Sequence, residues 1–302
     1  MEIPLVITHN DADGIICLSL FFKKFGSKAN VYFSSPSKIK KTLFSCIIKG
    51  KLGKLYVFDI SADSKSLLLS SLFEKAVWID HHIWPKQEEY KNVEVFVDSS
   101  SPSASQLVGK YFGIESNLIG IANEIDRNEI KSDEALFLRD LIAAIKFTKS
   151  YHKLRSLARD LAFSGIEKFE QNKSITILLK NYYEWKRQAE EDVLKKAKVF
   201  EVNGNRIAVY ESNNPIPVHI INDKLKEHSN APFDFIAAIF HKVDELKNTI
   251  FTKLELRSHT GKDVYKIVNL FGGGGHTTAG GASIKGFLST EKFLETLKNL
   301  QS

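Results

Sequence analysis

Acidic residues and histidines recur in this sequence at spacings that suit metal-dependent chemistry. They comprise His9, Asp11 and Asp13 at intervals of two, then Asp59, then Asp80-His81-His82, and finally Asp126. A set of carboxylates and imidazoles without thiolates suits Mn²⁺, Mg²⁺ or Zn²⁺. Carboxylates brought close together in space would repel one another unless cations lie between them. Two divalent cations about 3.5–4 Å apart are a common arrangement for phosphoryl transfer. A single Asp at a strand end is usually a helix cap or a turn residue, so the expectation depends on the whole set.

The elements around these residues are predicted to place them at one edge of a sheet. Short apolar runs predict strands over 3–8, 55–60, 76–79 and 93–97, with helical segments at 15–25 and 65–74. Strands that alternate with helices predict a mostly parallel α/β sheet with helices on both faces. Ligands bind outside the carboxyl ends of such strands, where His9, Asp59 and Asp80 fall. If the chain stays extended from His9 to Asp13, the side chains at 9, 11 and 13 leave on one face.

Three successive parts are predicted along the chain. Residues 1–145 are predicted to form the parallel-sheet domain. An alternative is that the helices of this domain extend to about residue 190. Residues 132–198 have a helical pattern throughout, and 146–198 are predicted to be a helical connector. Strand patterns at 206–210, 235–240 and 249–257 then predict a smaller α/β domain over 199–302.

Composition restricts the class of protein. The 302 residues are 43% hydrophobic, which is enough for real cores, and the two cysteines exclude a disulfide scaffold. No apolar run reaches the roughly 18 residues that a membrane-spanning helix needs. The N-terminus has neither the basic region nor the small-residue cleavage site of a signal peptide. These features predict a cytoplasmic protein with no membrane partner.

The positive charge is concentrated in one segment. The formal net charge is +6, and residues 146–198 carry 13 Lys and Arg against 7 Asp and Glu. A localised basic stretch can attract a polyanion. A solvated helical face has the same composition, so both interpretations stay open.

The motifs, taken in order, resemble those of the DHH phosphoesterase superfamily. The N-terminal motifs are Thr8–Gly14 (THNDADG), Phe58-Asp59 and Ile79–His82 (IDHH). Near the C-terminus, Leu256-Arg257-Ser258, Phe271–His276 (FGGGGH) and Ala279-Gly280-Gly281 resemble the DHH-associated C-terminal domain. The resemblance covers nearly the whole chain. The two-residue gap from His9 to Asp11 is closer to the RecJ-like exonuclease branch than to the nanoRNase branch, where the gap is usually four.

The resemblance implies a role for each residue at the strand ends. His9 and Asp11 correspond to ligands of one metal, and Asp13, His81 and Asp126 to ligands of the other; Asp59 would bridge the two. Asp80 would orient a histidine, and His82 would face the scissile phosphate. Asp98 is the alternative to Asp126. The implied cofactors are two divalent cations, with Mn²⁺ favoured over Mg²⁺ or Co²⁺.

The C-terminal glycines are predicted to bind substrate. Consecutive glycines at Gly273, Gly274 and Gly275 let a backbone approach a ligand closely and offer N–H groups to a phosphate. His276 and Arg257 could add charge-assisted hydrogen bonds to the same anion. A flexible turn between two elements is the alternative for a bare glycine run.

Together these features predict a metal-dependent phosphodiesterase or exonuclease that hydrolyses short single-stranded RNA or DNA to mononucleotides. Linear or cyclic dinucleotides and 3′-phosphoadenosine 5′-phosphate are alternative substrates. An inactive scaffold of a replication complex is the alternative of another class, and an active enzyme could also associate with a replication or repair complex. The sequence leaves RNA against DNA, the polarity of degradation and the oligomeric state open.

Overall fold

Each half of the chain builds its own sheet. The structure is a computed structural model that describes residues 3–84, 88–169, 172–244 and 249–299. The chain divides into two units, Met1–Tyr182 and Tyr183–Ser302. No helix within the described residues is both long enough and apolar enough to cross a membrane.

The first unit contains a five-stranded sheet whose strands are all parallel. The strands are β1 (Leu5–His9), β2 (Asn30–Ser34), β3 (Lys54–Phe58), β4 (Lys75–Asp80) and β5 (Val93–Val97). Their spatial order is β2-β1-β3-β4-β5, which confirms the predicted parallel sheet. The sequence reading did not include β2, whose side chains are mostly half-buried because it lies at the edge. Since β2 is an edge strand, β1, β3 and β4 remain neighbours and their carboxyl ends lie side by side.

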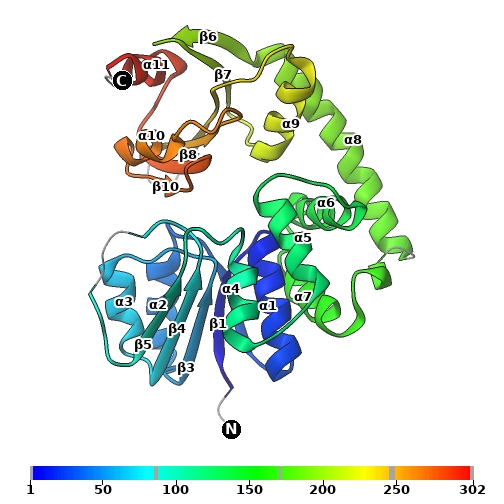
Figure 1. Ribbon diagram of the computed structural model, residues 1–302, viewed down its shortest axis with the longest axis vertical. Helices are drawn as coiled ribbons and strands as arrows, with labels where there is room; N and C mark the ends of the chain where they lie inside the picture. Colours follow the sequence, from blue (N-terminus) through cyan, green and yellow to red (C-terminus); the bar gives the residue numbers. More distant parts are fainter. Residues whose placement is uncertain (1–2, 85–87, 170–171, 245–248, 300–302) are drawn as a thin grey trace. The chain divides into compact units, whose positions relative to one another are not determined.

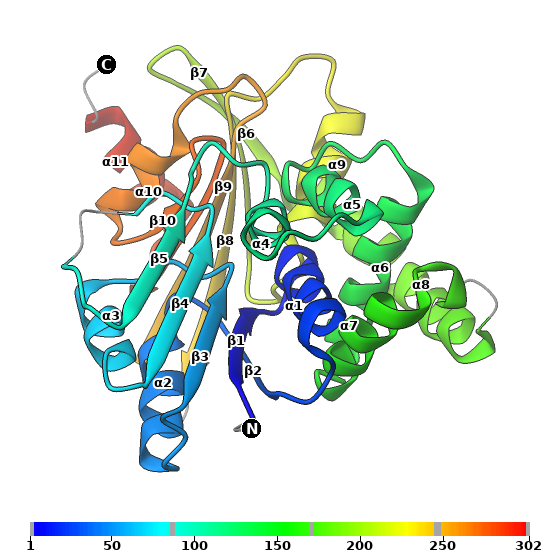
Figure 2. The ribbon, with the colours of Figure 1, turned by 60° about the horizontal axis from the view of Figure 1, so that its bottom comes forward.

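Helices cover both faces of this sheet (Figures 1 and 2), as predicted. On one face lie α1 (Ala12–Phe25) and α4 (Ala104–Phe112), and on the other lie α2 (Ile39–Ile48) and α3 (Ser64–Ser70). The Phe21 ring of α1 lies 5.0 Å from the Tyr56 ring of β3. The neighbouring β3 residue, Val57, faces the opposite side, where it joins a buried cluster with Leu43 of α2 and Leu67 of α3. Because successive side chains of a strand point to opposite faces of the sheet, each strand contributes residues to a hydrophobic core on both faces.

The chain does not stay extended from His9 to Asp13, so the condition for the side chains at 9, 11 and 13 to leave on one face is not met. Helix α1 begins at Ala12 because Asp11 is its N-cap, with the Asp11 carboxylate accepting a hydrogen bond from the Gly14 N–H. A Cβ at position 14 would lie 2.4 Å from the His9 carbonyl oxygen. Glycine at 14 therefore lets the helix start directly against the end of β1.

The helical segment of the first unit is interrupted. It contains α5 (Asn117–Asp126), α6 (Asp133–Phe147), α7 (His152–Ser164), the short 3₁₀ helix η1 (Glu167–Phe169) and the start of α8 (Lys173–Lys196). The breaks after α6 and α7 coincide with left-handed backbone at Lys149 and Gly165. Helix α8 continues into the second unit and ends at Lys196, and Lys198 already belongs to a strand. The proposed connector 146–198 thus contains α7, η1 and α8, and its boundaries stay a prediction.

The second unit contains a six-stranded mixed sheet, which confirms the predicted smaller α/β fold. Its strands are β6 (Lys198–Val202), β7 (Asn205–Ser212), β8 (Phe235–Asp244), β9 (Thr249–Arg257), β10 (Gly274–Gly275) and β11 (Ala279–Lys285), in the order β10-β11-β9-β8-β7-β6. Within the described part of this second sheet, β7 and β8 pair in parallel and the other neighbours pair antiparallel. One face packs against α10 (Val264–Leu270) and α11 (Thr290–Asn299), and the other against α9 (Val218–His228) and the end of α8. Asn203 and Gly204, both with positive φ, form the turn of the β6–β7 hairpin.

Candidate active site

The acidic and histidine residues predicted from the sequence gather at the carboxyl edge of the first unit's sheet. They form groups whose candidate ligand atoms lie within 4.8 Å of one another: His9 with Asp11 and Asp59, Asp13 with His81 and Asp126, and Asp59 with Asp80 and His82. The elements that bring them together are the ends of β1, β3 and β4, the start of α1 and the end of α5. The first two groups correspond to the two ligand sets that the resemblance implies. Which residues bind metal stays a prediction.

Asp59 lies between the two groups. Its carboxylate is 2% exposed, with Oδ2 3.5 Å from His9 Nδ1 and Oδ1 3.7 Å from His81 Nε2. Oδ2 is buried and makes no hydrogen bond to any residue that the structure describes. Burial, together with the charges of Asp11 and Asp13, raises the pKa of Asp59 well above its usual range. The backbone of Asp59 is left-handed, with φ of 56°, a conformation that a non-glycine residue adopts at some energetic cost and that occurs often at functional sites.

His81 Nε2 lies close to three carboxylates. Its Nδ1 lies 3.3 Å from the carbonyl oxygen of Ser101, which can only accept, so Nδ1 carries a proton. The other ring nitrogen, Nε2, lies 3.7, 3.7 and 3.4 Å from oxygens of Asp13, Asp59 and Asp126. An Nδ1–H held by a carbonyl, with Nε2 directed at carboxylates, is the usual arrangement of a metal-binding histidine.

The N-terminus of α4 fixes Asp13. Its carboxylate accepts hydrogen bonds from the Ala104 N–H at 2.6 Å and the Ser105 N–H at 2.9 Å, and from the Ser105 hydroxyl. Burial raises the pKa of Asp13 although His81 and Ser105 oppose the shift. The helix that holds Asp13 starts in the serine-rich segment 99–105, where Ser103 is the N-cap of α4. The positioning role of Ser105 was not predicted; its only signal was that serine-rich composition.

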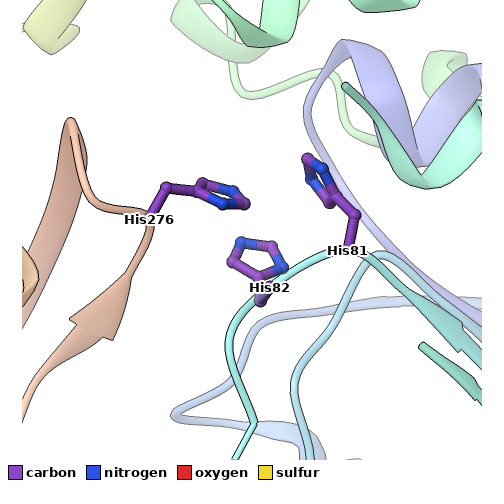
Figure 3. Close-up of side chains that lie close together, drawn as sticks. All are labelled: His81, His82 and His276. Carbon is purple, nitrogen blue, oxygen red and sulfur yellow. The ribbon is translucent and has the colours of Figure 1, made fainter. Parts of the chain in front are cut away.

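Asp80 is fully buried, and each of its oxygens has a donor. Oδ1 lies 2.7 Å from Nδ1 of His82, and Oδ2 accepts a hydrogen bond from the Trp84 indole N–H at 2.5 Å. Burial opposes ionisation, but His82 and Trp84 lower the pKa of Asp80 to about 2. In return, although its own burial opposes the shift, Asp80 raises the pKa of His82 to about 9. His81 and His82 follow β4 with their rings in different planes (Figure 3), at an interplanar angle of 70°. Asp80 therefore orients His82, and Trp84 is a further positioning residue that the sequence reading missed.

A lysine from α6 lies at the same edge. Lys146 Nζ donates to the Asn10 side-chain oxygen at 3.4 Å. Burial would raise the pKa of Asp11, but the His9 ring, 2.5 Å away, and the Lys146 charge hold it below its usual range. No sequence signal indicated Lys146, because 136 residues separate it from Asn10.

Asp126 and Asp98, the two alternatives for one metal-ligand position, have different surroundings. Asp126 Oδ2 lies 3.4 Å from His81 Nε2. Burial and the Asp13 charge raise the pKa of Asp126 to about 7. Asp98 is exposed and accepts hydrogen bonds from the N–H and hydroxyl of Ser100. The structure thus brings Asp126, rather than Asp98, to the other residues.

These residues fit divalent cations. The buried Asp59 oxygen without a hydrogen bond among the described residues and the raised pKa values of three carboxylates are each unfavourable when no cation is bound. Oxygen and imidazole nitrogen donors suit Mn²⁺ and Mg²⁺.

We expect the metal-free protein to lose stability as the pH rises. The pKa of Asp126 is about 7 in the folded protein and 3.8 in a model peptide, so at intermediate pH the folded state holds a proton that the unfolded chain has released. The stabilisation that this proton gives is therefore lost progressively between those two pH values. Chelator-treated protein should show a lower free energy of unfolding at about pH 7 than at about pH 5 in urea titrations. Asp126→Asn should flatten this dependence, and a rise in stability over the same range would contradict it.

In the second unit, the glycine run packs closely against its own sheet. A Cβ at Gly273 would lie 2.3 Å from the Gly281 carbonyl oxygen, and one at Gly275 would lie 2.4 Å from that of Ala279. The N–H of Gly273 donates to Val268, and that of His276 donates to Ala279. Close packing of the backbone therefore explains why glycine is needed at positions 273 and 275. The Gly273 N–H already donates to a carbonyl oxygen. Gly274 has open space around its Cβ position.

This difference predicts opposite outcomes for two neighbouring substitutions. Gly273→Ala should lower the free energy of unfolding by about 1–3 kcal/mol, because the new methyl group overlaps backbone atoms of β11. Gly274→Ala should leave stability within about 0.5 kcal/mol and serves as the matched control. Thermal denaturation compares the two, and equal melting temperatures would contradict the packing explanation.

The other predicted substrate-binding residues flank this loop. Arg257 ends β9, which pairs with β11, and Arg257 lies opposite Ala279. Its guanidinium donates to the Leu256 carbonyl at 2.9 Å. The adjacent Ser258 has a buried hydroxyl that makes no hydrogen bond within the described part of the chain. His276 follows β10 directly. Their contacts with a substrate remain a prediction.

Comparisons with known proteins agree with this architecture. Residues 203–302 match the DHHA1 domain family, whereas no curated protein matches the sequence. The DHH domain of a protein described as a member of a family of ribosomal proteins is 16% identical, with a TM-score of 0.63 over 100% of this chain and 88% of that one. The pGpG-specific phosphodiesterase PggH from Vibrio cholerae is 14% identical, with a TM-score of 0.56 over 93% of each chain. RecJ from Thermus thermophilus, solved in complex with Mn²⁺, is 12% identical, with a TM-score of 0.56 over 97% of this chain and 50% of that one.

At these identities the structural likenesses establish the fold. Residues 203–302 belong to the DHHA1 domain family. The chain as a whole has the fold of these solved structures, one of which is described as a DHH domain.

Proposed function

We propose that the protein is a two-metal phosphodiesterase that hydrolyses short single-stranded oligonucleotides to mononucleotides. The observation that carries the proposal is the convergence of two ligand groups on the buried carboxylate of Asp59. His9 and Asp11 would hold one cation, Asp13, His81 and Asp126 the other, and Asp59 both. Mn²⁺ is the favoured ion because the donors are carboxylates and imidazoles. The Mn²⁺ complex of a structural neighbour supports this choice.

The chain's own residues would orient the substrate and stabilise its charge. Bound cations supply activation of water and stabilisation of phosphoryl charge. His82, whose pKa of about 9 keeps it protonated at neutral pH, donates through Nδ1 to Asp80, so Nε2 would meet a phosphate oxygen. Lys146 adds a second positive charge beside Asn10. In the second unit, Arg257, Gly274 and His276 would bind the terminal phosphate of the substrate, and Gly273 and Gly275 would shape the loop that carries them.

A dinucleotide phosphodiesterase is the second candidate. PggH acts on pGpG, and the likeness extends over 93% of both chains, so the two proteins have similar size and organisation. RecJ, in contrast, is about twice as long as the matched region.

One side-by-side assay tests the proposal. Purified protein with Mn²⁺ is incubated with labelled RNA and DNA oligomers, linear and cyclic dinucleotides, and 3′-phosphoadenosine 5′-phosphate. Release of mononucleotides from the oligomers supports the proposal, and cleavage of dinucleotides alone supports the second candidate. Intact substrates, with Mn²⁺ binding shown by calorimetry, would contradict both. A protein that binds no Mn²⁺ would favour the inactive scaffold.

A further inference from the structure

The connection between α6 and α7 has an unusual composition for a surface corner. Residues 146–153 read KFTKSYHK, and the longer stretch 141–159 contains five Lys and Arg and no Asp or Glu. Basic residues interleaved with aromatic residues are the pattern of surfaces that bind single-stranded nucleic acid.

This corner begins at the candidate active site. Its first residue, Lys146, donates to the side chain of Asn10, which lies between His9 and Asp11 in the sequence. The residues that follow Lys146 therefore lead from the metal-ligand edge of the first unit onto its surface.

The backbone of the corner is fixed by hydrogen bonds. The Lys149 N–H donates to the Lys146 carbonyl at 3.0 Å, and the Ser150 N–H donates to the Ile145 carbonyl at 3.1 Å. The Thr148 hydroxyl donates to the Ile145 carbonyl at 3.1 Å. Lys149 has left-handed backbone, with φ of 54°, which turns the chain sharply between the helices. These hydrogen bonds and the turn at Lys149 define the path of the backbone from which the side chains of the corner project.

The side chains that this backbone displays are exposed. Phe147 is 41% exposed and Tyr151 is 44% exposed, and both rank among the large exposed apolar side chains of the described residues. Lys149, His152 and Lys153 are exposed beside them. Two aromatic faces and two ammonium groups therefore share one short, acid-free segment.

We propose that the α6–α7 corner binds the part of a single-stranded oligonucleotide that extends beyond the metal centre. Bases stack on Phe147 and Tyr151, and Lys149 and Lys153 contact phosphates. The inference rests on the proposed function and deepens it: the substrate is a strand longer than a dinucleotide, and affinity rises with its length.

The test compares an octanucleotide with a dinucleotide on the full-length protein. Fluorescence anisotropy with a labelled octathymidylate in EDTA measures binding without cleavage, and steady-state kinetics with Mn²⁺ gives kcat and KM for both lengths. The double variant Lys149→Gln/Lys153→Gln should reduce the slope of log K against log salt by about 1.4, since each phosphate contact to a single strand contributes about 0.7. Tyr151→Ala should weaken octanucleotide binding on the order of tenfold. For both variants, KM for the dinucleotide should stay unchanged.

The matched control is Lys65→Gln/Lys91→Gln, which removes the same charge from exposed sites elsewhere on the first unit. Phe147→Ala would also remove a contact inside the protein, because the Phe147 ring lies 6.3 Å from the Tyr182 ring. Tyr151→Ala is therefore the aromatic variant used to test base stacking. An equal change in salt slope for the control, or an equal rise in KM for both lengths, would overturn the inference. Failure to cleave any substrate would contradict the proposed function instead, because the anisotropy measurement does not depend on hydrolysis.

Discussion

Asp59→Asn is expected to abolish hydrolysis while making the metal-free protein more stable. The carboxylate is buried, its Oδ2 makes no hydrogen bond to the described residues, and burial and neighbouring charges raise its pKa well above the usual range. A neutral amide of the same shape requires neither a buried charge nor the uptake of a proton on folding, so the melting temperature in EDTA should rise by about 2–4 °C for each kcal/mol gained. The same change removes the group proposed to contact both cations, so activity should fall on the order of 10³-fold or more.

Mn²⁺ distinguishes this result from a general defect. Cation at about 100 times its dissociation constant should stabilise the wild-type protein by about 2.7 kcal/mol, and the gain should largely vanish in Asp59→Asn. Asp98→Asn is the control, because Asp98 is an exposed Asp whose oxygen bonds Ser100. A lower melting temperature of Asp59→Asn in EDTA, or full stabilisation by Mn²⁺, would show that Asp59 has a structural role only.

His82→Ala should lower kcat on the order of 10²- to 10³-fold and leave the Mn²⁺-induced stabilisation intact. The expectation follows from the assignment of His82 to the substrate phosphate rather than to a cation. Asp80→Asn should cost about 10- to 100-fold. An amide has a single acceptor oxygen, so either His82 or Trp84 loses its acceptor, and the carboxylate charge that holds the His82 proton is lost.

The double variant decides whether Asp80 acts through His82. If it does, His82→Ala/Asp80→Asn should be no slower than His82→Ala alone, because residues that act as a unit give non-additive losses. Calorimetry with Mn²⁺ is the accompanying readout and should give the same stoichiometry in all three variants. Additive losses, or reduced Mn²⁺ binding in Asp80→Asn, would place Asp80 among the cation ligands instead.

The sequence was informative where local motifs coincide with strand ends. The apolar runs before His9, Asp59 and Asp80 predicted strands, and the rule for parallel sheets then predicted that their ends meet. The structure has β1, β3 and β4 as neighbours. The missed strand β2 did not disturb this prediction because it pairs at the outer side of β1.

The sequence was less informative where partners are distant or where one residue has two roles. Ser105 lies 92 positions from Asp13, and Lys146 lies 136 positions from Asn10, so no local pattern could have paired them. The backbone after His9 is helical from Ala12 rather than extended, because Asp11 is an effective N-cap. The glycine run was interpreted from its freedom to approach a ligand, whereas Gly273 and Gly275 approach their own sheet.

The N-cap geometry at Asp11 and the α4 cradle around Asp13 also bear on how metal exchanges. One Asp11 oxygen accepts a hydrogen bond from Gly14, and the Asp13 carboxylate accepts hydrogen bonds from Ala104 and Ser105, so two helix starts fix these proposed ligands without any bound ion. If they bind cations as proposed, loading and release would need little rearrangement of the backbone. Occupancy would then follow the free concentration of the ion, and a chelator should remove activity reversibly without unfolding the protein. The protein would thus be folded before its cations bind, unlike a small domain that folds only with its metal.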